Sequence, residues 1–341
     1  MTETPSLHLD YPAAELVQPD GHAVPERLAG RLHLHFLDRP ADSAARSGPQ
    51  RLRVLVATHA PREVDGRTVD APRGTILFSP GRTEFIEKYL ETISDLVARG
   101  FWVVMVDPRG QGLSDRLLPD RLKSYVSSFQ DYADDLGWVC ETLSPHLPRP
   151  LVIMGHSMGG TIVLQAVLTG TVSPSAVICS APMLGLMDLD TAMIRGAITG
   201  LSALGLSQRN LPFQKQRGGL PVAFADNKLT TDPERYARWA SFFQNTPRLR
   251  VGEPTFGWIA EALKAMAFVN RNAGSLGVPG LMVAAGGDQI VDPMAVQDFA
   301  LKSGCEYRVV PGAKHELFLE RDELREAFFE AIDDFLEQQG L

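Results

Sequence analysis

A serine between two glycines is the first feature of this sequence whose residue types and spacing could do chemistry. The stretch 154–161 reads MGHSMGGT, so Ser157 stands two residues after Gly155 and two residues before Gly159. An apolar run precedes this stretch and a helix-compatible run follows it, which is the strand-turn-helix context of a nucleophile elbow. Such a turn exposes the serine and points the first amides of the helix at the same place. The pattern predicts that Ser157 is a nucleophile of acyl transfer.

A serine nucleophile needs a base, and the sequence offers one histidine in the right part of the chain. In this motif the acid and then the histidine follow the serine along the chain. The chain has eight histidines, and His315 is the only one after Ser157. It lies in PGAKHELF, directly after a strand-like run at 306–310. His315 is therefore predicted to be the general base. His156, beside the serine, is predicted to pack or hydrogen-bond next to the elbow, because adjacent side chains on a sharp turn diverge.

Two aspartates compete for the role of the acid that orients the base. Asp288 and Asp292 both follow the apolar run 281–286, in GGDQIVDPMAV. Asp292 precedes Pro293 at the start of a helical pattern, which is typical of a helix N-cap. Asp288 comes directly off the strand, at the edge where active sites of parallel sheets form. We favour Asp288, and Asp292 remains the alternative.

Alternating strand and helix patterns indicate how these residues are positioned. The pattern predicts an α/β fold in which a mostly parallel central sheet is flanked by helices. Expected strands fall at 30–37, 51–59, 74–78, 101–106, 151–154, 176–180, 281–286 and 306–310, and expected helices at 84–98, 124–143, 158–169, 293–303 and 320–337. The alternation stops over 183–278, which carries helical stretches and no obvious strand. We therefore divide the chain into an N-terminal extension (1–27), a core in two parts (28–182 and 279–341) and a helical cap (183–278).

Composition narrows the class of protein. The 341 residues are 44% hydrophobic, which suffices for a large core. The net charge of −8 disfavours a general nucleic-acid binder. The N-terminus lacks the features of a signal peptide and the apolar runs are too short to span a bilayer, so a cytoplasmic protein is expected, with peripheral contact to the inner face of the membrane left open. The three cysteines have no disulfide or metal spacing, and no metal or organic cofactor is indicated.

These residues and their order resemble a known family. GHSMGG together with Asp288 and His315 is similar to the α/β-hydrolase superfamily, and more narrowly to the serine-aminopeptidase-like branch that holds bacterial lysophospholipases and monoacylglycerol lipases. The resemblance runs from about residue 28 to the C-terminus. It is carried by SPGRTEFIEKY, DPRGQGLSDR, GHSMGG, GGDQIVD and GAKH, and in the cap by LTTDPERYARW and VGEPTFGWIAEAL.

The resemblance implies roles for individual residues. Ser157 would be the nucleophile, His315 the base and Asp288 the orienting acid. The oxyanion would be held by the backbone N–H groups of Met158 and Arg82. The chain departs from most of the superfamily at one place, because Pro80-Gly81 stands where His-Gly is usual. The hydrogen bonds that this histidine would supply to hold the loop are therefore missing.

The implied function is hydrolysis of the carboxylic ester of a single-chain lipid, a lysophospholipid first and a monoacylglycerol second. Apolar cap residues are expected to line a narrow covered cleft, with Phe256 and Trp258 as substrate contacts. The apolar and aromatic cap residues are Met183, Leu184, Leu186, Met187, Phe213, Phe224, Trp239, Phe242, Phe243, Phe256 and Trp258. Three alternatives stay open: a general carboxylesterase, a serine aminopeptidase, for which the cap offers acidic residues (Asp226, Asp232 and Glu234), and a non-catalytic lipid-binding or sensing protein.

Overall fold

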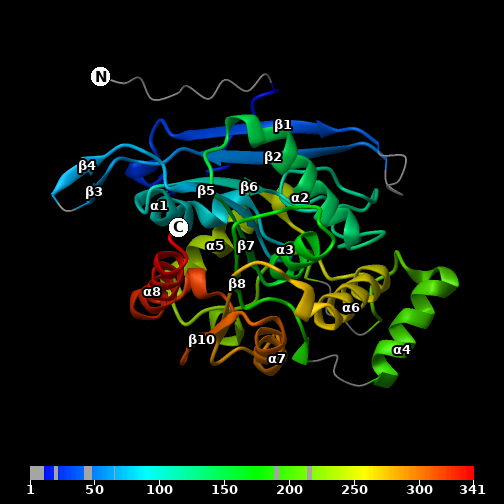
Figure 1. Cartoon of the computed structure of the whole chain (residues 1–341). Helices are drawn as coiled ribbons and strands as arrows, with labels where there is room; N and C mark the ends of the chain where they lie inside the picture. Colours follow the sequence, from blue (N-terminus) through cyan, green and yellow to red (C-terminus); the bar gives the residue numbers. More distant parts are fainter. Residues whose placement is uncertain (1–10, 19–21, 42–47, 65, 188–191, 213–216) are drawn as a thin grey trace.

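The structure is a computed structural model that describes residues 11–18, 22–41, 48–64, 66–187, 192–212 and 217–341. Its centre is an eight-stranded sheet with the order β1-β2-β6-β5-β7-β8-β9-β10 (Figure 1). The strands are β1 (Leu32–Arg39), β2 (Gln50–Ala57), β5 (Gly74–Ser79), β6 (Phe101–Val106), β7 (Leu151–His156), β8 (Ala176–Ser180), β9 (Gly280–Ala285) and β10 (Glu306–Val310). Within this sheet, the pairs β1/β2 and β2/β6 are antiparallel and the other pairs are parallel. The predicted mostly parallel sheet is confirmed.

Helices cover both faces of this sheet, which is why the central strands read as nearly continuous apolar runs. Side chains of α2, α3 and α7 pack in one core cluster and side chains of α1 and α8 in another. The strands alternate between the two clusters, since Val104 joins the first whereas Val103 and Met105 join the second. The helices are α1 (Leu90–Ala98), α2 (Gln130–Leu143), α3 (Met158–Leu168), α7 (Pro293–Ser303) and α8 (Asp322–Gln338).

Several elements differ from the expected boundaries. The expected helix 84–98 is a short 3-10 turn, η2 (Ile86–Tyr89), followed by α1. The expected helix 124–143 begins only at Gln130, because Ser124 is bound to the insertion: its carbonyl accepts the N–H and the hydroxyl of Thr255. A two-stranded hairpin, β3 (Arg62–Val64) and β4 (Arg67–Val69), was not anticipated at all.

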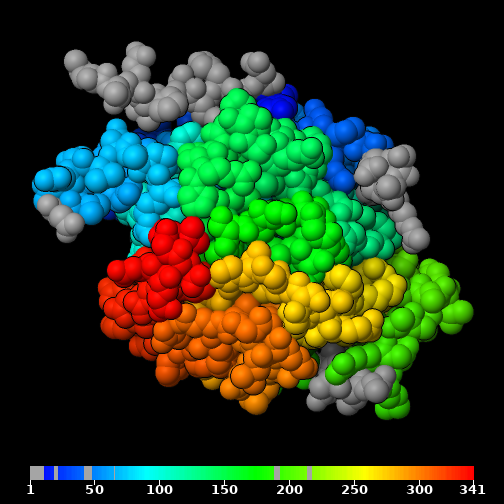
Figure 2. Space-filling model, viewed as in Figure 1, coloured from blue at the N-terminus to red at the C-terminus, as the bar shows by residue number. Residues whose placement is uncertain are grey.

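The insertion between β8 and β9 is helical in the part that the structure describes. Its main helices are α4 (Ala192–Leu201), α5 (Pro233–Asn245) and α6 (Phe256–Arg271). Helix α6 contacts α3, which starts at the elbow, and α4 contacts α6. Helix α4 stands out at the edge of the molecule, and the space-filling view shows the same light-green lobe (Figure 2). No helix among the described residues is both long enough and apolar enough to cross a bilayer.

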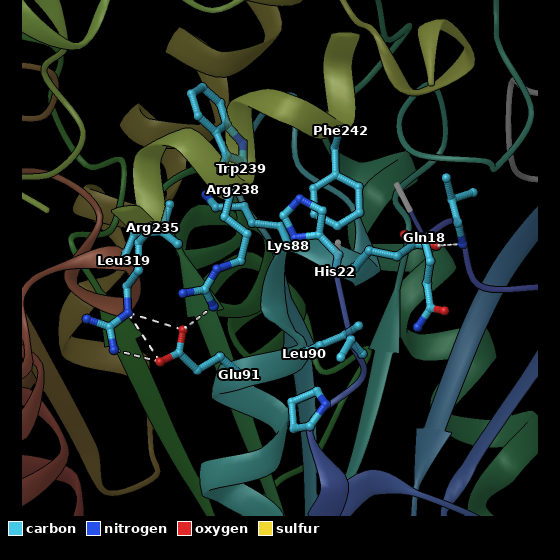
Figure 3. Close-up of a pocket in the computed structure, with 14 residues that line it drawn as sticks. Gln18, His22, Lys88, Leu90, Glu91, Arg235, Arg238, Trp239, Phe242 and Leu319 are labelled. Atoms are coloured by element: carbon cyan, nitrogen blue, oxygen red, sulfur yellow. Dashed lines mark hydrogen bonds and ion pairs between the residues drawn. The ribbon is translucent and has the colours of Figure 1, made fainter. Parts of the chain in front are cut away.

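The described part of the N-terminal extension packs against the core and the insertion. Val17 donates its backbone N–H to Glu87, and its side chain joins an apolar cluster with Trp239 and Phe242 of α5. A cavity of about 280 Å³ lies between this segment, α1 and α5 (Figure 3). Ser157, Asp288 and His315 are not among the residues that line it.

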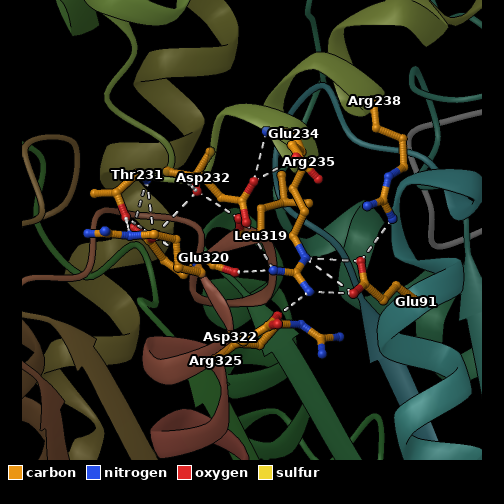
Figure 4. A network of polar contacts seen from close by, with 12 residues as sticks. Glu91, Thr231, Asp232, Glu234, Arg235, Arg238, Leu319, Glu320, Asp322 and Arg325 are labelled. Carbon is orange, nitrogen blue, oxygen red and sulfur yellow. Dashed lines mark hydrogen bonds and ion pairs between the residues drawn. The ribbon is translucent and has the colours of Figure 1, made fainter.

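A polar network fixes α5 to the core (Figure 4). Arg235 donates hydrogen bonds to Glu91 in the first turn of α1, to Asp322 at the start of α8 and to the carbonyl of Glu320. Glu320 is fully buried, and its carboxylate accepts the N–H of Thr231. This side of the insertion is therefore bound closely to the core, in contrast to the protruding α4.

Candidate active site

Ser157 occupies a strained turn between β7 and α3. Its φ of 51° lies in the left-handed region that residues with a side chain rarely adopt. The turn needs glycine on both sides: a Cβ at Gly155 would lie 2.4 Å from the carbonyl oxygen of Gly159, and a Cβ at Gly159 would lie 2.0 Å from that of Ser79. The two glycines of the motif thus allow the elbow to sit directly against the end of β5.

The structure brings together the three side chains that the sequence selects. His315 Nε2 lies 2.9 Å from Ser157 Oγ, and His315 Nδ1 lies 2.7 Å from Asp288 Oδ2. The other carboxylate oxygen of Asp288 accepts the N–H groups of Ile290 and Val291, so the carboxylate is fixed in orientation. The histidine and the aspartate are buried, whereas the serine is partly exposed. This is the geometry of an activated serine with an oriented base.

Asp292 lies at a different place, where it has a structural contact of its own. Its carboxylate accepts the N–H of Met294 and caps α7. No hydrogen bond or ion pair between Asp292 and His315 is found among the described residues. The sequence pattern Asp292-Pro293, which is typical of a helix N-cap, thus marks the start of α7, where the Asp292 carboxylate binds the N–H of Met294.

The two N–H groups expected to form an oxyanion hole are both available. No hydrogen bond of the Met158 or Arg82 N–H group is found within the described part of the chain, although the flanking residues of Arg82 are bound on both sides. Gly81 donates its N–H to Glu84, and Thr83 donates its N–H to Gln111 at 2.6 Å. The loop 80–83 is therefore held by its neighbours while the N–H between them stays free.

These two contacts explain how the loop keeps its shape without the usual histidine. Proline at position 80 supplies no such hydrogen bonds, and in this chain the loop is held by Glu84 and Gln111. Neither residue was selected from the sequence. Their positions, Glu84 four residues after Pro80 and Gln111 in the DPRGQG stretch, did not reveal that both bind the loop.

Phe256 and Trp258 lie in the main core cluster and are nearly buried. Trp258 packs edge-on against Phe129, with ring centroids 5.5 Å apart, and the guanidinium of Arg82 lies 5.7 Å from its ring centroid. Trp239, Phe242 and Phe243 instead form the cluster with the N-terminal extension, Met187 and Phe224 are exposed, and Phe213 lies outside the described residues. The apolar residues of the insertion thus divide between two clusters and the surface.

One set of side chains in the described structure has the spacing of metal ligands: Glu84, His156 and Glu316. The ammonium group of Lys88 contacts both carboxylates of this set. A cation is therefore already present between the two acidic ligands, and the donor set does not fit a resident metal ion.

Comparison with known proteins identifies the family. Residues 70–322 match the family described as serine aminopeptidase, S33. The chain belongs to this family. It is 33% identical to lysophospholipase L2 of Escherichia coli over 282 residues, which cover 78% of this chain and 81% of that protein. It is 28% identical to monoacylglycerol lipase of Mycolicibacterium smegmatis, over 74% of this chain and 84% of that protein.

Solved structures agree with the fold of the S33 family. A soluble variant of the monoglyceride lipase of Saccharomyces cerevisiae, in complex with a substrate analogue, superposes with a TM-score of 0.67 at 18% identity and covers 96% of this chain and 99% of that chain. The predictions of an α/β-hydrolase fold, and of an ester hydrolase related to lysophospholipases and monoacylglycerol lipases, are confirmed.

Proposed function

We propose that this protein cleaves the carboxylic ester of a single-chain lipid through an acyl-serine intermediate. Two observations carry the proposal: the contact chain Ser157–His315–Asp288, and the 33% identity to a lysophospholipase over most of both chains. The non-catalytic alternative is disfavoured because a binding protein has no need of an oriented base on an exposed serine.

The proposed reaction has two halves. His315 Nε2 takes the proton of Ser157 Oγ while that oxygen attacks the ester carbonyl, and the N–H groups of Met158 and Arg82 stabilise the oxyanion. The tetrahedral intermediate collapses, and the alcohol leaves with the proton from His315. Water then gives a proton to His315 and attacks the acyl-serine, which releases the fatty acid and restores the serine. Asp288 keeps the Nδ1 proton in place throughout.

The side chain of Arg82 favours a lysophospholipid over a monoacylglycerol. It extends from the proposed oxyanion loop to the insertion, where it donates a hydrogen bond of 3.0 Å to the carbonyl of Gly252. No ion pair of Arg82 is found among the described residues, although its guanidinium offers five donors. Glu253 and Glu84 lie near enough to act on Arg82 electrostatically, but neither forms an ion pair with it among the described residues. A partly buried arginine with donors left over suits the phosphate of a lipid head group.

The aminopeptidase alternative lacks comparable support. A substrate amine needs a free carboxylate near the serine. Asp232 caps α5 and pairs with Arg235, while Asp226 and Glu234 are exposed. None of the three contacts the residues of the Ser157–His315–Asp288 chain in the described structure.

Peripheral membrane contact is proposed for the protruding helix α4 and the turn after it. Met193 and Leu204 are 81% and 80% exposed, and Ile194 and Leu201 are also exposed, which leaves an apolar face on the outermost element. Because the proposed substrate is a lipid, we propose that this apolar face binds to a lipid surface. In flotation with zwitterionic vesicles, Met193→Ser with Leu204→Ser should reduce the bound fraction. Leu301→Ser, which changes an equally exposed leucine on α7, should not.

Product analysis tests the function. Purified protein is incubated with a lysophospholipid, a monoacylglycerol, a diacyl phospholipid and a triacylglycerol, and released fatty acid is measured. The single-chain lipids should be hydrolysed faster, and Ser157→Ala should lose about a million-fold in turnover. Equal rates on one-chain and two-chain lipids would contradict the substrate class. More than a few percent of activity in Ser157→Ala would contradict the mechanism.

A further inference from the structure

Four titratable side chains form a buried cluster beneath the proposed site. Glu84, Lys88, His156 and Glu316 are each no more than 8% exposed. They come from separate parts of the chain: Glu84 and Lys88 follow the oxyanion loop, His156 ends β7, and Glu316 lies in the loop after β10. The mechanism proposed above uses none of them, although burying such groups is costly unless they are paired.

The contacts of this quartet run through Lys88. Its ammonium forms ion pairs with Glu84 and, at 2.7 Å, with Glu316. Glu84 also accepts the N–H of Gly81 and the hydroxyl of Tyr89. Beyond Glu316, the chain of contacts continues to His156, whose Nε2 lies 3.1 Å from a carboxylate oxygen of Glu316.

Three of the residues in these contacts are next in sequence to a proposed catalytic group. Gly81 directly precedes Arg82, whose N–H is a proposed oxyanion donor. His156 directly precedes Ser157, and Glu316 directly follows His315. His156 is held in turn by the carbonyl of Ser180 at 3.1 Å from Nδ1. The quartet thus connects the oxyanion loop, the elbow and the histidine loop beneath the reacting atoms.

The charges of the quartet balance when His156 is protonated. Burial works against a charged imidazole, but the Glu316 and Glu84 carboxylates outweigh it and raise the pKa of His156. Burial also opposes ionisation of Glu316, yet His156 and Lys88 hold the pKa of that carboxyl well below its ordinary value. Burial and the nearby Glu316 raise the pKa of Glu84. Lys88 contacts both carboxylates, and His156 reinforces the charge of Glu316.

We infer that Glu84 and Lys88 are positioning residues, which hold the Arg82 N–H at the distance from Ser157 and His315 that oxyanion stabilisation requires. This inference rests on the proposed hydrolase function. A hydrogen-bond donor aimed at an oxyanion acts only if its position is fixed before the reaction. Gly81 is one residue from the donor, and its own N–H is held by the Glu84 carboxylate that Lys88 pairs with.

A double-mutant cycle tests the inference with a soluble p-nitrophenyl ester, so that the lipid head group does not enter. Lys88→Met leaves two buried carboxylates without their shared cation, and kcat should fall about 100-fold, the scale for a lost oxyanion donor, with KM within about threefold. In Glu84→Gln with Lys88→Met, the amide oxygen can accept the Gly81 N–H and the amide nitrogen can donate to the adjacent Glu316. The double variant should recover at least about tenfold of kcat over Lys88→Met.

Titration with a fluorophosphonate separates positioning from simple loss of folded protein. In a positioning role the Lys88→Met enzyme stays fully titratable and turns over slowly, whereas partial unfolding lowers the titratable fraction and the turnover together. Arg39→Met is the control for removal of a buried cation, because Arg39 forms a buried ion pair with Asp135 at 2.7 Å, a carboxylate that Arg109 also binds. It should keep kcat within about threefold for each titrated site.

Three outcomes overturn the inference: a double variant no faster than Lys88→Met, a loss confined to KM, or a loss of kcat that Arg39→Met shares. Failure of the proposed function gives a different result. In that case the wild-type protein hydrolyses the ester no faster than Ser157→Ala does. The Lys88, Glu84 and Arg39 variants then show no difference in kcat from the wild type.

Discussion

The two aspartates after β9 allow one substitution to separate catalysis from helix capping. We consider aspartate to asparagine at both positions, because the change alters one atom and keeps the side-chain volume. Asp288 Oδ1 accepts two backbone N–H groups and Oδ2 faces His315 Nδ1 at 2.7 Å. In Asp288→Asn the amide oxygen can keep the backbone contacts, but the amide nitrogen then faces His315 as a donor.

The expected loss follows from the tautomer of the base. A donor opposite Nδ1 places the His315 proton on Nε2, which lies 2.9 Å from Ser157 Oγ and must accept the serine proton. Turnover should fall by about four orders of magnitude, or about 5 kcal/mol in the barrier. Asp292→Asn should change neither kcat nor Tm, because asparagine caps a helix as well as aspartate. Asp292→Ala should cost about 1 kcal/mol of stability, or about 2 °C in Tm.

The assay is steady-state hydrolysis of a soluble ester, with melting curves of all three variants beside the wild type. The pattern that would refute the reasoning is a large loss of kcat in Asp292→Asn with near-normal turnover in Asp288→Asn. Retention of more than a tenth of wild-type kcat in Asp288→Asn would also remove the carboxylate from the mechanism.

Three other predictions address the substrate and the buried charges. Arg82→Met should lower kcat/KM for a lysophospholipid about 10- to 100-fold, the value of a charge-assisted hydrogen bond, and leave a monoacylglycerol within about threefold; equal losses on both lipids would show that the guanidinium serves the loop instead of the phosphate. Within a series of monoesters, kcat/KM should rise from acetyl to longer acyl chains, at up to about 0.8 kcal/mol per buried methylene, and a flat or falling series would refute an acyl cleft. The pKa of His156 is raised in the folded protein. Protonation of His156 should therefore stabilise the fold fully below the unfolded pKa of about 6.5, and this stabilisation should decline as pH rises through the folded pKa. The difference in Tm between wild type and His156→Asn should shrink with rising pH, and a constant difference would contradict a charged His156.

Much of the fold was predictable because its signals are local. The apolar run 101–106 and the run before Gly155 read as buried strands, and both are strands of the sheet. The start of α2 could not be read in this way. Val126 and Phe129 continue the helical spacing, but Ser124 is bound to Thr255, about 130 residues later in the chain. Such a contact has no signature in the residues around Ser124.

The same distinction applies to the candidate site. Ser157 and His315 could be selected because the elbow has a fixed local spacing and one histidine follows it. Asp288 could be preferred because the neighbouring aspartate showed the local pattern of a cap. The packing of the aromatic residues could not be predicted in this way. Trp239 and Phe242 pack with Val17 of the N-terminal extension, and helical periodicity does not indicate which segment a helix packs against.

Pro80, which stands where most of the superfamily has a histidine, shows how a local sequence pattern and long-range contacts act on the same loop. Viewed as sequence, the change removes hydrogen bonds from the oxyanion loop and leaves its donor in doubt. In the fold, the loop is anchored by Glu84, which binds Gly81, and by Gln111, which binds Thr83 on the other side of the proposed donor. Burying the Glu84 carboxylate requires a cation, and Lys88, one helical turn later, supplies it. Lys88 also pairs with Glu316, which directly follows the proposed base His315, so the charges that hold the proposed oxyanion loop extend to the loop of that histidine.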